Sequence, residues 1–188
     1  MEKILWSENK LPKTDNKQLA VMALDEINKA HEFHKSFPQY APTPLVPLKN
    51  IILLREEELS AGSFSFPKTD ERFLHIKKVL KLGIGSVFIK DESWRFGLNA
   101  FKVLGGSFAM AKYIAKQLKK DVSELPYDVL TGEKLRKEFG QATFFTATDG
   151  NHGRGVAWAA NKLGQKSVVL MPKGSTKTRF DNIAKEGA

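Results

Sequence analysis

Apolar and polar positions follow two different periods along the chain, and the change of period marks the predicted elements. From residue 142 onward, short apolar runs alternate with longer segments whose apolar residues recur every three or four positions. The short runs, Ala142 to Ala147 and Ser167 to Met171, are typical of strands, and the longer segments, Gly150 to Leu163 and Thr176 to Glu186, of helices. Strands that alternate with helices of this length predict βαβ units around a parallel sheet.

The earlier part of the chain is predicted to be largely helical. Apolar residues at spacings of three and four predict a helix from about Asn16 to Ser36, which ends before Pro38 because proline lacks an amide hydrogen. A short run of β-forming residues predicts a strand over 86–90. Helices are expected over 107–119, with Ser107 as N-cap, and over 127–139. The remaining predictions are an irregular arm over 1–16, a loop over 59–72, a short helix over 76–82, and either a strand or a helical turn over 51–54.

Composition excludes several classes of protein and site. The 188 residues include no cysteine, which rules out disulfides and thiolate metal sites and fits a reducing cytoplasm. We find no signal-peptide core and no run of the ~18 apolar residues that suggest a membrane span. The net charge of +9 comes from scattered lysines without a nucleic-acid-binding module, and His31 and His34 alone are too few for a metal site. We therefore expect a cytoplasmic protein with no metal, no membrane association and no nucleic-acid partner.

One lysine has unusual neighbours in the sequence. Lys102 lies between Phe101 and Val103, after the predicted strand and a turn, and just before a glycine pair and a helix. Lysines normally lie on polar faces, and an amine in an apolar setting loses its proton more easily. A deprotonated amine is what covalent attachment to a carbonyl cofactor requires. The competing interpretation is a solvated lysine near a turn.

The second candidate is the glycine-rich polar run from Thr146 to Gly155. It lies between the end of a predicted strand and the start of a predicted helix. Open α/β sheets bind ligands at such places, and the free amide groups of a helix N-terminus favour anions. Glycines there let the backbone approach a ligand closely. Many nucleotide-binding folds also have a glycine-rich strand–helix turn, so a generic nucleotide-binding domain stays open as an alternative.

The two stretches resemble those of the fold type II pyridoxal-phosphate enzymes, the group of tryptophan synthase β and threonine deaminase. Asn99-Ala100-Phe101-Lys102 lies where that group usually has Gly-Ser-Phe-Lys, and Thr148-Asp149-Gly150-Asn151-His152 lies where it has Ser-x-Gly-Asn-His. Within the group, the run from Arg95 to Lys102 matches the family of diaminopropionate ammonia-lyases. The resemblance implies an α/β fold of type II, with parallel sheets and flanking helices, and pyridoxal 5′-phosphate as the cofactor.

The resemblance also implies roles for individual residues. Lys102 would form a Schiff base with the cofactor and then act as a base at the substrate Cα. Asn151 would donate a hydrogen bond to the cofactor's phenolic oxygen, and Thr148, Asp149 and Gly150 would lie beside the substrate. For Asn151 the competing interpretation is a helix N-cap or turn asparagine.

Asp149 distinguishes the chain from most of the group, which has a small or neutral residue at that position. A carboxylate would repel the substrate's carboxyl group, but it can pair with a second substrate amine. It can also act as a base on the face opposite Lys102, so that one site removes the Cα proton from either enantiomer. In the resembled lyases the aspartate serves the D-isomer and the lysine the L-isomer. The alternative role is helix capping.

The resemblance predicts a division into domains. We expect residues 1–120 to form the first part of the large cofactor domain and residues 121–188 most of the small domain. A parallel unit of two strands leaves apolar faces uncovered. In the resembled enzymes the phosphate-binding loop and the residue facing the pyridine nitrogen lie beyond the position of residue 188. We therefore expect the chain to be an N-terminal part of a longer enzyme, incomplete at its C-terminus.

The function that the resemblance predicts for the complete enzyme is the elimination of ammonia from D- or L-2,3-diaminopropionate, giving pyruvate and a second ammonia. The partner would be a small amino-acid substrate, and the full-length enzyme would be a homodimer. Two further functions stay open. One is a related serine or threonine ammonia-lyase that shares Lys102 and Asn151, and the other is an inactive pyridoxal-phosphate-binding fragment without the phosphate loop.

Overall fold

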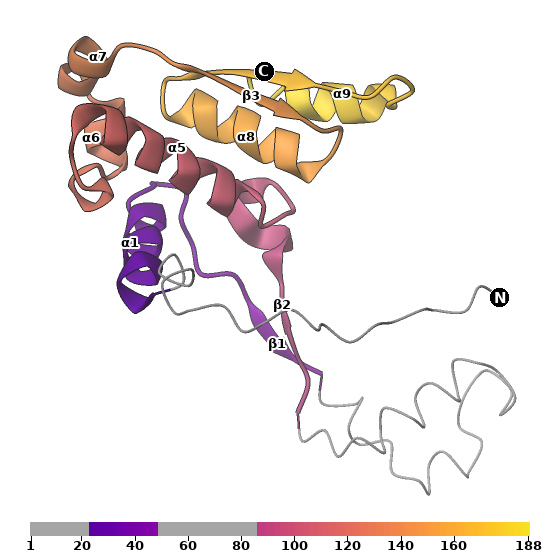
Figure 1. Ribbon diagram of the computed structural model, residues 1–188. Helices are drawn as coiled ribbons and strands as arrows, with labels where there is room; N and C mark the ends of the chain where they lie inside the picture. Colours follow the sequence, from indigo (N-terminus) through magenta and orange to yellow (C-terminus); the bar gives the residue numbers. More distant parts are fainter. Residues whose placement is uncertain (1–22, 49–85) are drawn as a thin grey trace, which may run out of the picture. The chain divides into compact units, whose positions relative to one another are not determined.

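The computed structural model describes residues 23–48 and 86–188 (Figure 1). The predictions for 1–16, 51–54, 59–72 and 76–82, and for the first part of the helix from Asn16, lie outside these residues. The described elements are, in chain order, α1 (Leu24–Lys35), β1 (Leu45–Pro47), β2 (Phe88–Lys90), the 3₁₀ helix η2 (Glu92–Gly97), α5 (Val103–Leu118), the 3₁₀ helix η3 (Val122–Glu124), α6 (Tyr127–Thr131), α7 (Glu133–Phe139), β3 (Thr143–Ala147), α8 (Asn151–Lys162), β4 (Lys166–Leu170) and α9 (Lys177–Ala184).

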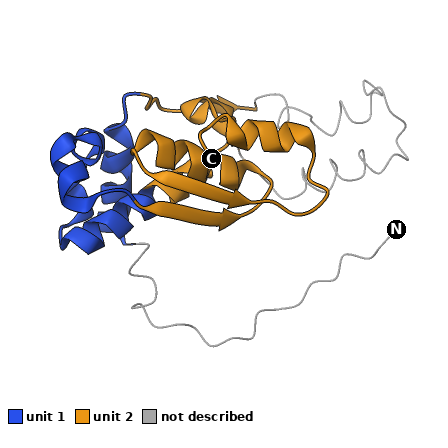
Figure 2. Ribbon diagram, turned by 90° about the horizontal axis from the view of Figure 1, so that it is seen from above, with its two compact units in different colours: residues 1–38, 108–141 blue, residues 39–107, 142–188 orange. Residues whose placement is uncertain are grey.

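The chain divides into two compact units, coloured separately in Figure 2. One unit contains residues 1–38 and 108–141, and the other contains residues 39–107 and 142–188. Helix α5 contributes to both units because the division falls within it. The division at residue 120 concerns the domains of a complete enzyme, and it stays a prediction.

The first unit is helical, and its core is apolar. Phe33 of α1 packs against Phe108 of α5 with ring centroids 5.7 Å apart, and the Ser36 hydroxyl accepts a hydrogen bond from the amide of Tyr127 at 2.8 Å. The helix predicted over 127–139 is two helices, because Gly132 has an extended ψ of 150°. The C-cap glycine of α7, Gly140, has a φ of +79°, which glycine adopts without strain.

Helix α5 begins earlier than predicted. Its first residue is Val103, directly after Lys102. Ser107, predicted as the N-cap, is instead buried inside the helix, where its hydroxyl donates to the Leu104 carbonyl at 3.2 Å. The helix is amphipathic, since Ala111 and Ala115 are buried. The lysines on the opposite face, Lys112, Lys116 and Lys119, are exposed.

The second unit contains both strand pairs. Strands β1 and β2 pair in antiparallel fashion, with Val46 opposite Ile89. The strand predicted over 86–90 is therefore confirmed, but its antiparallel partner was not part of the predicted parallel arrangement. Strands β3 and β4 form the predicted parallel pair, with Ala147 opposite Leu170 at their carboxyl ends.

Helix α8 covers one face of the parallel pair. A Cβ atom on Gly153 would lie 2.8 Å from Val169 Cγ1 and 2.9 Å from Thr148 Cγ2, so only glycine allows the helix to lie this close. The other face is exposed, and beyond its first pair, Thr143 and Lys166, it carries the apolar residues Phe145, Ala147, Val168 and Leu170. The prediction that a two-stranded parallel unit leaves an apolar face uncovered is thus confirmed for these strands.

A second close approach brings α8 against the start of α5. A Cβ atom on Gly155 would lie 2.9 Å from both the N and Cα atoms of Val103 and 3.3 Å from the carbonyl carbon of Lys102. One turn further along α8, Trp158 packs against the Phe96 ring with centroids 4.9 Å apart. The residues that lead into α5 are thus held against α8 by backbone and ring contacts.

Within residues 23–48 and 86–188, no helix combines the length and apolar character that crossing a membrane requires.

Substituting Gly155 by alanine tests the contact between α8 and α5. The added methyl group would press on backbone atoms, which cannot move aside as a flexible side chain can, so we expect Gly155→Ala to lower the free energy of unfolding by about 2–3 kcal/mol. Urea unfolding monitored by circular dichroism measures this change. The matched control is Gly105→Ala, a helical position with no neighbouring atom within 4 Å of the added Cβ. There we expect no loss, or a gain of up to about 0.5–1 kcal/mol. Equal effects of the two substitutions would contradict the close approach.

Candidate active site

The carboxyl ends of the two parallel strands bring separate segments together. Asp149 follows β3, while Ser175 and Arg179 follow β4. In the structure Arg179 donates to an Asp149 carboxylate oxygen, and the Ser175 hydroxyl donates to the same oxygen at 3.4 Å. Open α/β sheets place ligands at this edge.

The turn after β3 leads directly into α8. Gly150 is the N-cap of this helix and forms no side-chain cap hydrogen bond, while its amide donates to the Thr148 hydroxyl at 3.2 Å. Asn151, the first helical residue, has an exposed side chain. Because no side chain of the N-cap residue covers the first turn, this helix end suits an anionic or polar ligand. Asn151 is not the N-cap, so that part of the competing interpretation is wrong, while an asparagine that only shapes the turn stays an alternative.

Lys102 is the last residue before α5, and its side chain is exposed. The sequence predicted an apolar setting for this amine. That prediction is wrong for the described chain, because Lys102 is exposed and so is Phe101, at 58%, whereas Val103 is 1% exposed and packs inward. The Lys102 side chain is therefore accessible to a reagent or cofactor.

The close approach at Gly155 brings the Lys102 backbone and Asn151 into one region of the second unit. A Cβ atom on Gly155 would lie 3.3 Å from the carbonyl carbon of Lys102, so the two backbone segments pass close to each other. Asn151 lies four residues before Gly155, which places it on the same face of α8 and roughly 6 Å further along the helix axis. The lysine and the asparagine thus start from adjacent backbone segments, as a shared site requires.

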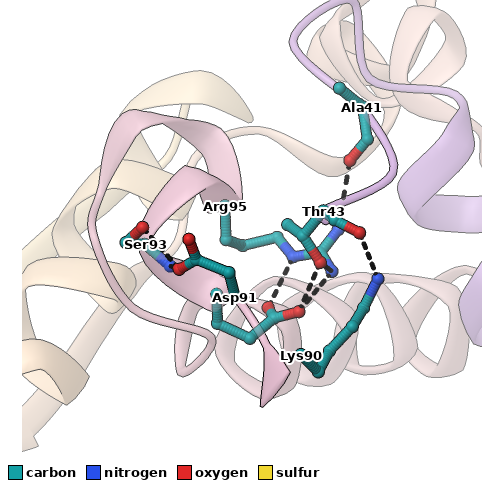
Figure 3. Close-up of polar contacts among 7 residues, drawn as sticks. Ala41, Thr43, Lys90, Asp91, Ser93 and Arg95 are labelled. Atoms are coloured by element: carbon teal, nitrogen blue, oxygen red, sulfur yellow. Dashed lines mark hydrogen bonds and ion pairs between the residues drawn. The ribbon is translucent and has the colours of Figure 1, made fainter. Parts of the chain in front are cut away.

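A buried ion pair stabilises the loop that leads to Lys102 (Figure 3). Arg95 is only 8% exposed. Its guanidinium donates to both carboxylate oxygens of Glu92, at 2.8 and 2.9 Å, and to the Thr43 hydroxyl at 3.1 Å. These hydrogen bonds hold the pKa of Glu92 below its usual value and raise that of Arg95. Bidentate pairs of this kind fix geometry as well as charge.

Asp91 holds the backbone of the same turn. Its carboxylate accepts hydrogen bonds from the amide of Ser93 at 3.0 Å and from the indole of Trp94 at 3.1 Å, and the bonds from Ser93 lower the pKa of this carboxyl. Glu92 thus binds Arg95, and Asp91 binds the amide and indole of the residues that follow it. Because both carboxylates are taken up by these hydrogen bonds, we do not assign them a role in acid–base catalysis.

Asp149 is ion-paired rather than helix-capping. It precedes the N-cap of α8, and its carboxylate pairs with Arg179. The hydrogen bond from Arg179 holds the pKa of the Asp149 carboxyl below its usual value, although partial burial acts in the opposite direction. Asp149 is therefore held in the charged form, which a base or an ammonium-binding group requires.

An open pocket of about 240 Å³ lies at this place in the second unit. Its lining combines the turn after β3, the start of α8 and the helix that follows β4, through Asp149, Gly150, Asn151, Arg154, Arg179, Asn182 and Ile183. The predicted site residues Asp149, Gly150 and Asn151 are thus brought together. Thr148 and Lys102 are not part of its lining, although both lie beside α8.

The residues at this site that follow β4 were not predicted from the sequence, among them Ser175 and Arg179, which bind Asp149. A signal was available, since both follow the second parallel strand and the carboxyl ends of parallel strands meet at one edge of a sheet. Among the described residues, no group of three or more histidine, aspartate and glutamate side chains is arranged to hold a metal ion.

Comparison with protein families matches residues 72–188 to the model described as "Pyridoxal-phosphate dependent enzyme". The chain belongs to this family. Membership accounts for the α/β fold of type II predicted from the sequence, and the region matched includes Lys102 and the run from Thr146 to Gly155.

Individual members of the family give a finer comparison. The chain is 44% identical over 172 residues to the diaminopropionate ammonia-lyase of Salmonella typhimurium, covering 90% of this chain and 36% of that protein. It is 40% identical to the enzyme of the same name from Escherichia coli.

Solved structures of the Escherichia coli enzyme are similar to the fold described above. The apo form has a TM-score of 0.66 at 37% identity, with 90% of this chain and 38% of that chain covered. A complex of the same enzyme with D-serine has a TM-score of 0.65. The chain thus spans about a third of the length of the relatives it matches.

Removing the guanidinium of Arg179 tests its control of Asp149. Because the pKa of Asp149 is lowered in the folded state, the stabilisation from this pair is present above the pKa of the unfolded carboxyl and is lost as the pH falls through the folded value. We expect Arg179→Gln to move the Asp149 titration to higher pH, measured by ¹³C NMR of the side-chain carboxyl. The matched control is Lys177→Gln, which removes a charge from the same helix but one that pairs with Asp181. An unchanged Asp149 midpoint in Arg179→Gln would contradict the assignment.

Proposed function

We propose that this chain carries the lysine-bearing part of the active site of a pyridoxal-phosphate-dependent ammonia-lyase that acts on 2,3-diaminopropionate. The observation that carries the proposal is the contact of Gly155 with Val103 and Lys102, which brings the start of α5 to the helix face that carries Asn151. The relatives named above support the substrate, since each bears the name diaminopropionate ammonia-lyase.

The described residues fit the cofactor in part. The exposed side chain of Lys102 is available for covalent attachment. Asn151, exposed at the start of α8, would donate its side-chain amide to the ring hydroxyl. The start of α8 offers amide groups without a side-chain cap. The resemblance places the phosphate contacts outside these residues, and the cover that would desolvate Lys102 would come from the cofactor and further polypeptide.

When bound, pyridoxal phosphate supplies an electron sink for the negative charge that develops at the substrate Cα. The residues of the chain would do the rest. Lys102 would hold the cofactor and then take the proton from the Cα of the L-substrate. Thr148 and Gly150 would hold the substrate carboxylate at the turn before α8, where amide groups favour an anion.

Asp149 gives the proposal its substrate class. A carboxylate held in the charged form can pair with the second ammonium group of diaminopropionate, or accept the Cα proton of the D-substrate from the face opposite Lys102. Serine and threonine have no second amine, so Asp149 would have no substrate ammonium to pair with if the chain belonged to a serine or threonine lyase. Since Arg179 is bonded to Asp149 in the structure, a substrate ammonium would have to displace the guanidinium or share the carboxylate with it.

The location and assembly of the complete enzyme belong to the same proposal. The absence of cysteine fits the cytoplasm, and we propose a homodimer for the full-length form. Two observations favour the alternative of an inactive cofactor-binding fragment. Lys102 is exposed, and the chain covers only 36% of the length of the Salmonella typhimurium enzyme.

Borohydride trapping tests the attachment site. The chain is incubated with pyridoxal phosphate and reduced with borohydride, which makes the attachment irreversible, and the labelled lysines are mapped by mass spectrometry. If Lys102 is the attachment site, the label should be mainly at Lys102. The control is Lys102→Arg, which keeps the charge but cannot attach the cofactor in this way, and which should lose that label. A preferred label at another lysine, in this chain and in a full-length enzyme that contains it, would overturn the proposal.

A full-length enzyme that contains this sequence allows the roles of the two bases to be separated. We expect Asp149→Asn to reduce kcat for D-diaminopropionate by about 10²- to 10⁴-fold, the usual contribution of a positioned base, and to affect the L-isomer less. Pyruvate release measured with each enantiomer gives both numbers. An equal or smaller loss with the D-isomer would show that Asp149 is not its base, and equal turnover of serine and diaminopropionate by the unmodified enzyme would favour the related lyase.

A further inference from the structure

The turn before Lys102 has an unfavourable backbone conformation. Phe96, Gly97 and Asn99 have positive φ angles of 50°, 70° and 57°. Only glycine adopts such angles freely, so Phe96 and Asn99 cost free energy that other contacts must offset. The turn ends at Lys102, and its shape therefore sets the direction from which the lysine side chain leaves the backbone.

Arg154 of α8 contacts this turn directly. Its Nη1 atom donates to the carbonyl oxygen of Leu98 at 3.1 Å, between the left-handed residues Gly97 and Asn99. Leu98 is itself 4% exposed, so its side chain is packed while its carbonyl is held by the guanidinium. The same residue is also tied to the start of the turn, because the Leu98 amide donates to the Arg95 carbonyl oxygen at 2.9 Å.

Glu186 in turn holds Arg154. The Nε and Nη2 atoms of Arg154 both lie 2.8 Å from one carboxylate oxygen of Glu186. The side chains are only 17% and 14% exposed, so solvent screens this pair less than a surface pair. The Glu186 carbonyl also accepts a hydrogen bond from the Asn161 side chain at 3.0 Å, which fixes the residue after α9 against α8. The planar guanidinium thus has one edge on Glu186 and its remaining nitrogen on Leu98.

We propose that Arg154, oriented by Glu186, is a positioning residue for Lys102. It holds the Leu98 carbonyl, keeps the left-handed turn at Asn99 closed, and so fixes where the lysine amine stands at the start of α5. The catalytic meaning of this role rests on the function proposed above, whereas its effect on the turn does not.

Hydrogen exchange of the 188-residue chain, measured by NMR, tests the effect on the turn. We expect Arg154→Gln to speed exchange of the amides at 98–102 by about 10-fold or more relative to amides elsewhere, because a partly buried, charged hydrogen bond is lost. Glu186→Gln, which keeps Arg154 but removes its partner's charge, should have the same effect more weakly. Arg154→Lys should not restore the original rates, since a single ammonium cannot replace the fork. The matched control is Arg136→Gln, an exposed arginine of α7, which should change none of these rates.

The consequence for the lysine is measured by trapping with pyridoxal phosphate and borohydride. In Arg154→Gln and Glu186→Gln we expect the share of label at Lys102, relative to all other lysines, to fall about 3- to 10-fold. Faster exchange at 98–102 together with this loss supports the proposal. Unchanged exchange at 98–102 in a folded Glu186→Gln chain overturns the proposal, and this holds even if Arg154→Gln does not fold. Faster exchange at 98–102 with an unchanged share of label at Lys102 overturns it as well. If the unmodified chain takes no label at Lys102, the proposed function fails and exchange alone decides whether Arg154 holds the turn.

Discussion

The contact between the backbone of α8 and the first turn of α5 is the constraint on which the second unit depends. Gly155 lies so close to Val103 that no larger residue fits without moving the backbone. This contact fixes the segment that ends at Lys102 against the helix that begins with Asn151. Gly153 makes a similar approach to the parallel strands, so α8 is held closely on two sides and carries the geometry of the site from the sheet to the lysine.

The charges of the site are arranged around this frame. The Arg95 and Glu92 pair holds the start of the lysine turn, and the Arg154 and Glu186 pair holds its middle. A third pair, Asp149 with Arg179, lies where the two parallel strands end. The first two pairs are largely buried and suit a structural role, while the third is more exposed and borders a polar pocket, which suits a group that exchanges partners when a ligand binds.

Much of this arrangement could be predicted from the sequence, and the failures have physical reasons. The alternation of apolar runs and amphipathic segments after residue 142 gave both strands and both helices, because local periodicity decides those elements. The start of α5 was misplaced, because serine is a preferred N-cap residue but Ser107 packs inside the helix. The setting of Lys102 was misjudged, because a neighbour's apolar character does not say which way its side chain points. Arg179 was missed although it follows the second parallel strand, whose carboxyl end lies beside that of the first. Glu186 was missed because only the fold brings it to Arg154.

The central claim is that Lys102 and the start of α8 form one cofactor site. Titrating the ¹⁵N-labelled chain with pyridoxal phosphate, and following its amide resonances, tests this most directly. The account predicts that the amides of Lys102 and Val103 shift together with those of Asn151 to Gly153, along a single binding curve. Shifts at Lys102 without any change over 151–153 would contradict it. So would binding curves with different midpoints for Lys102 and for residues 151–153.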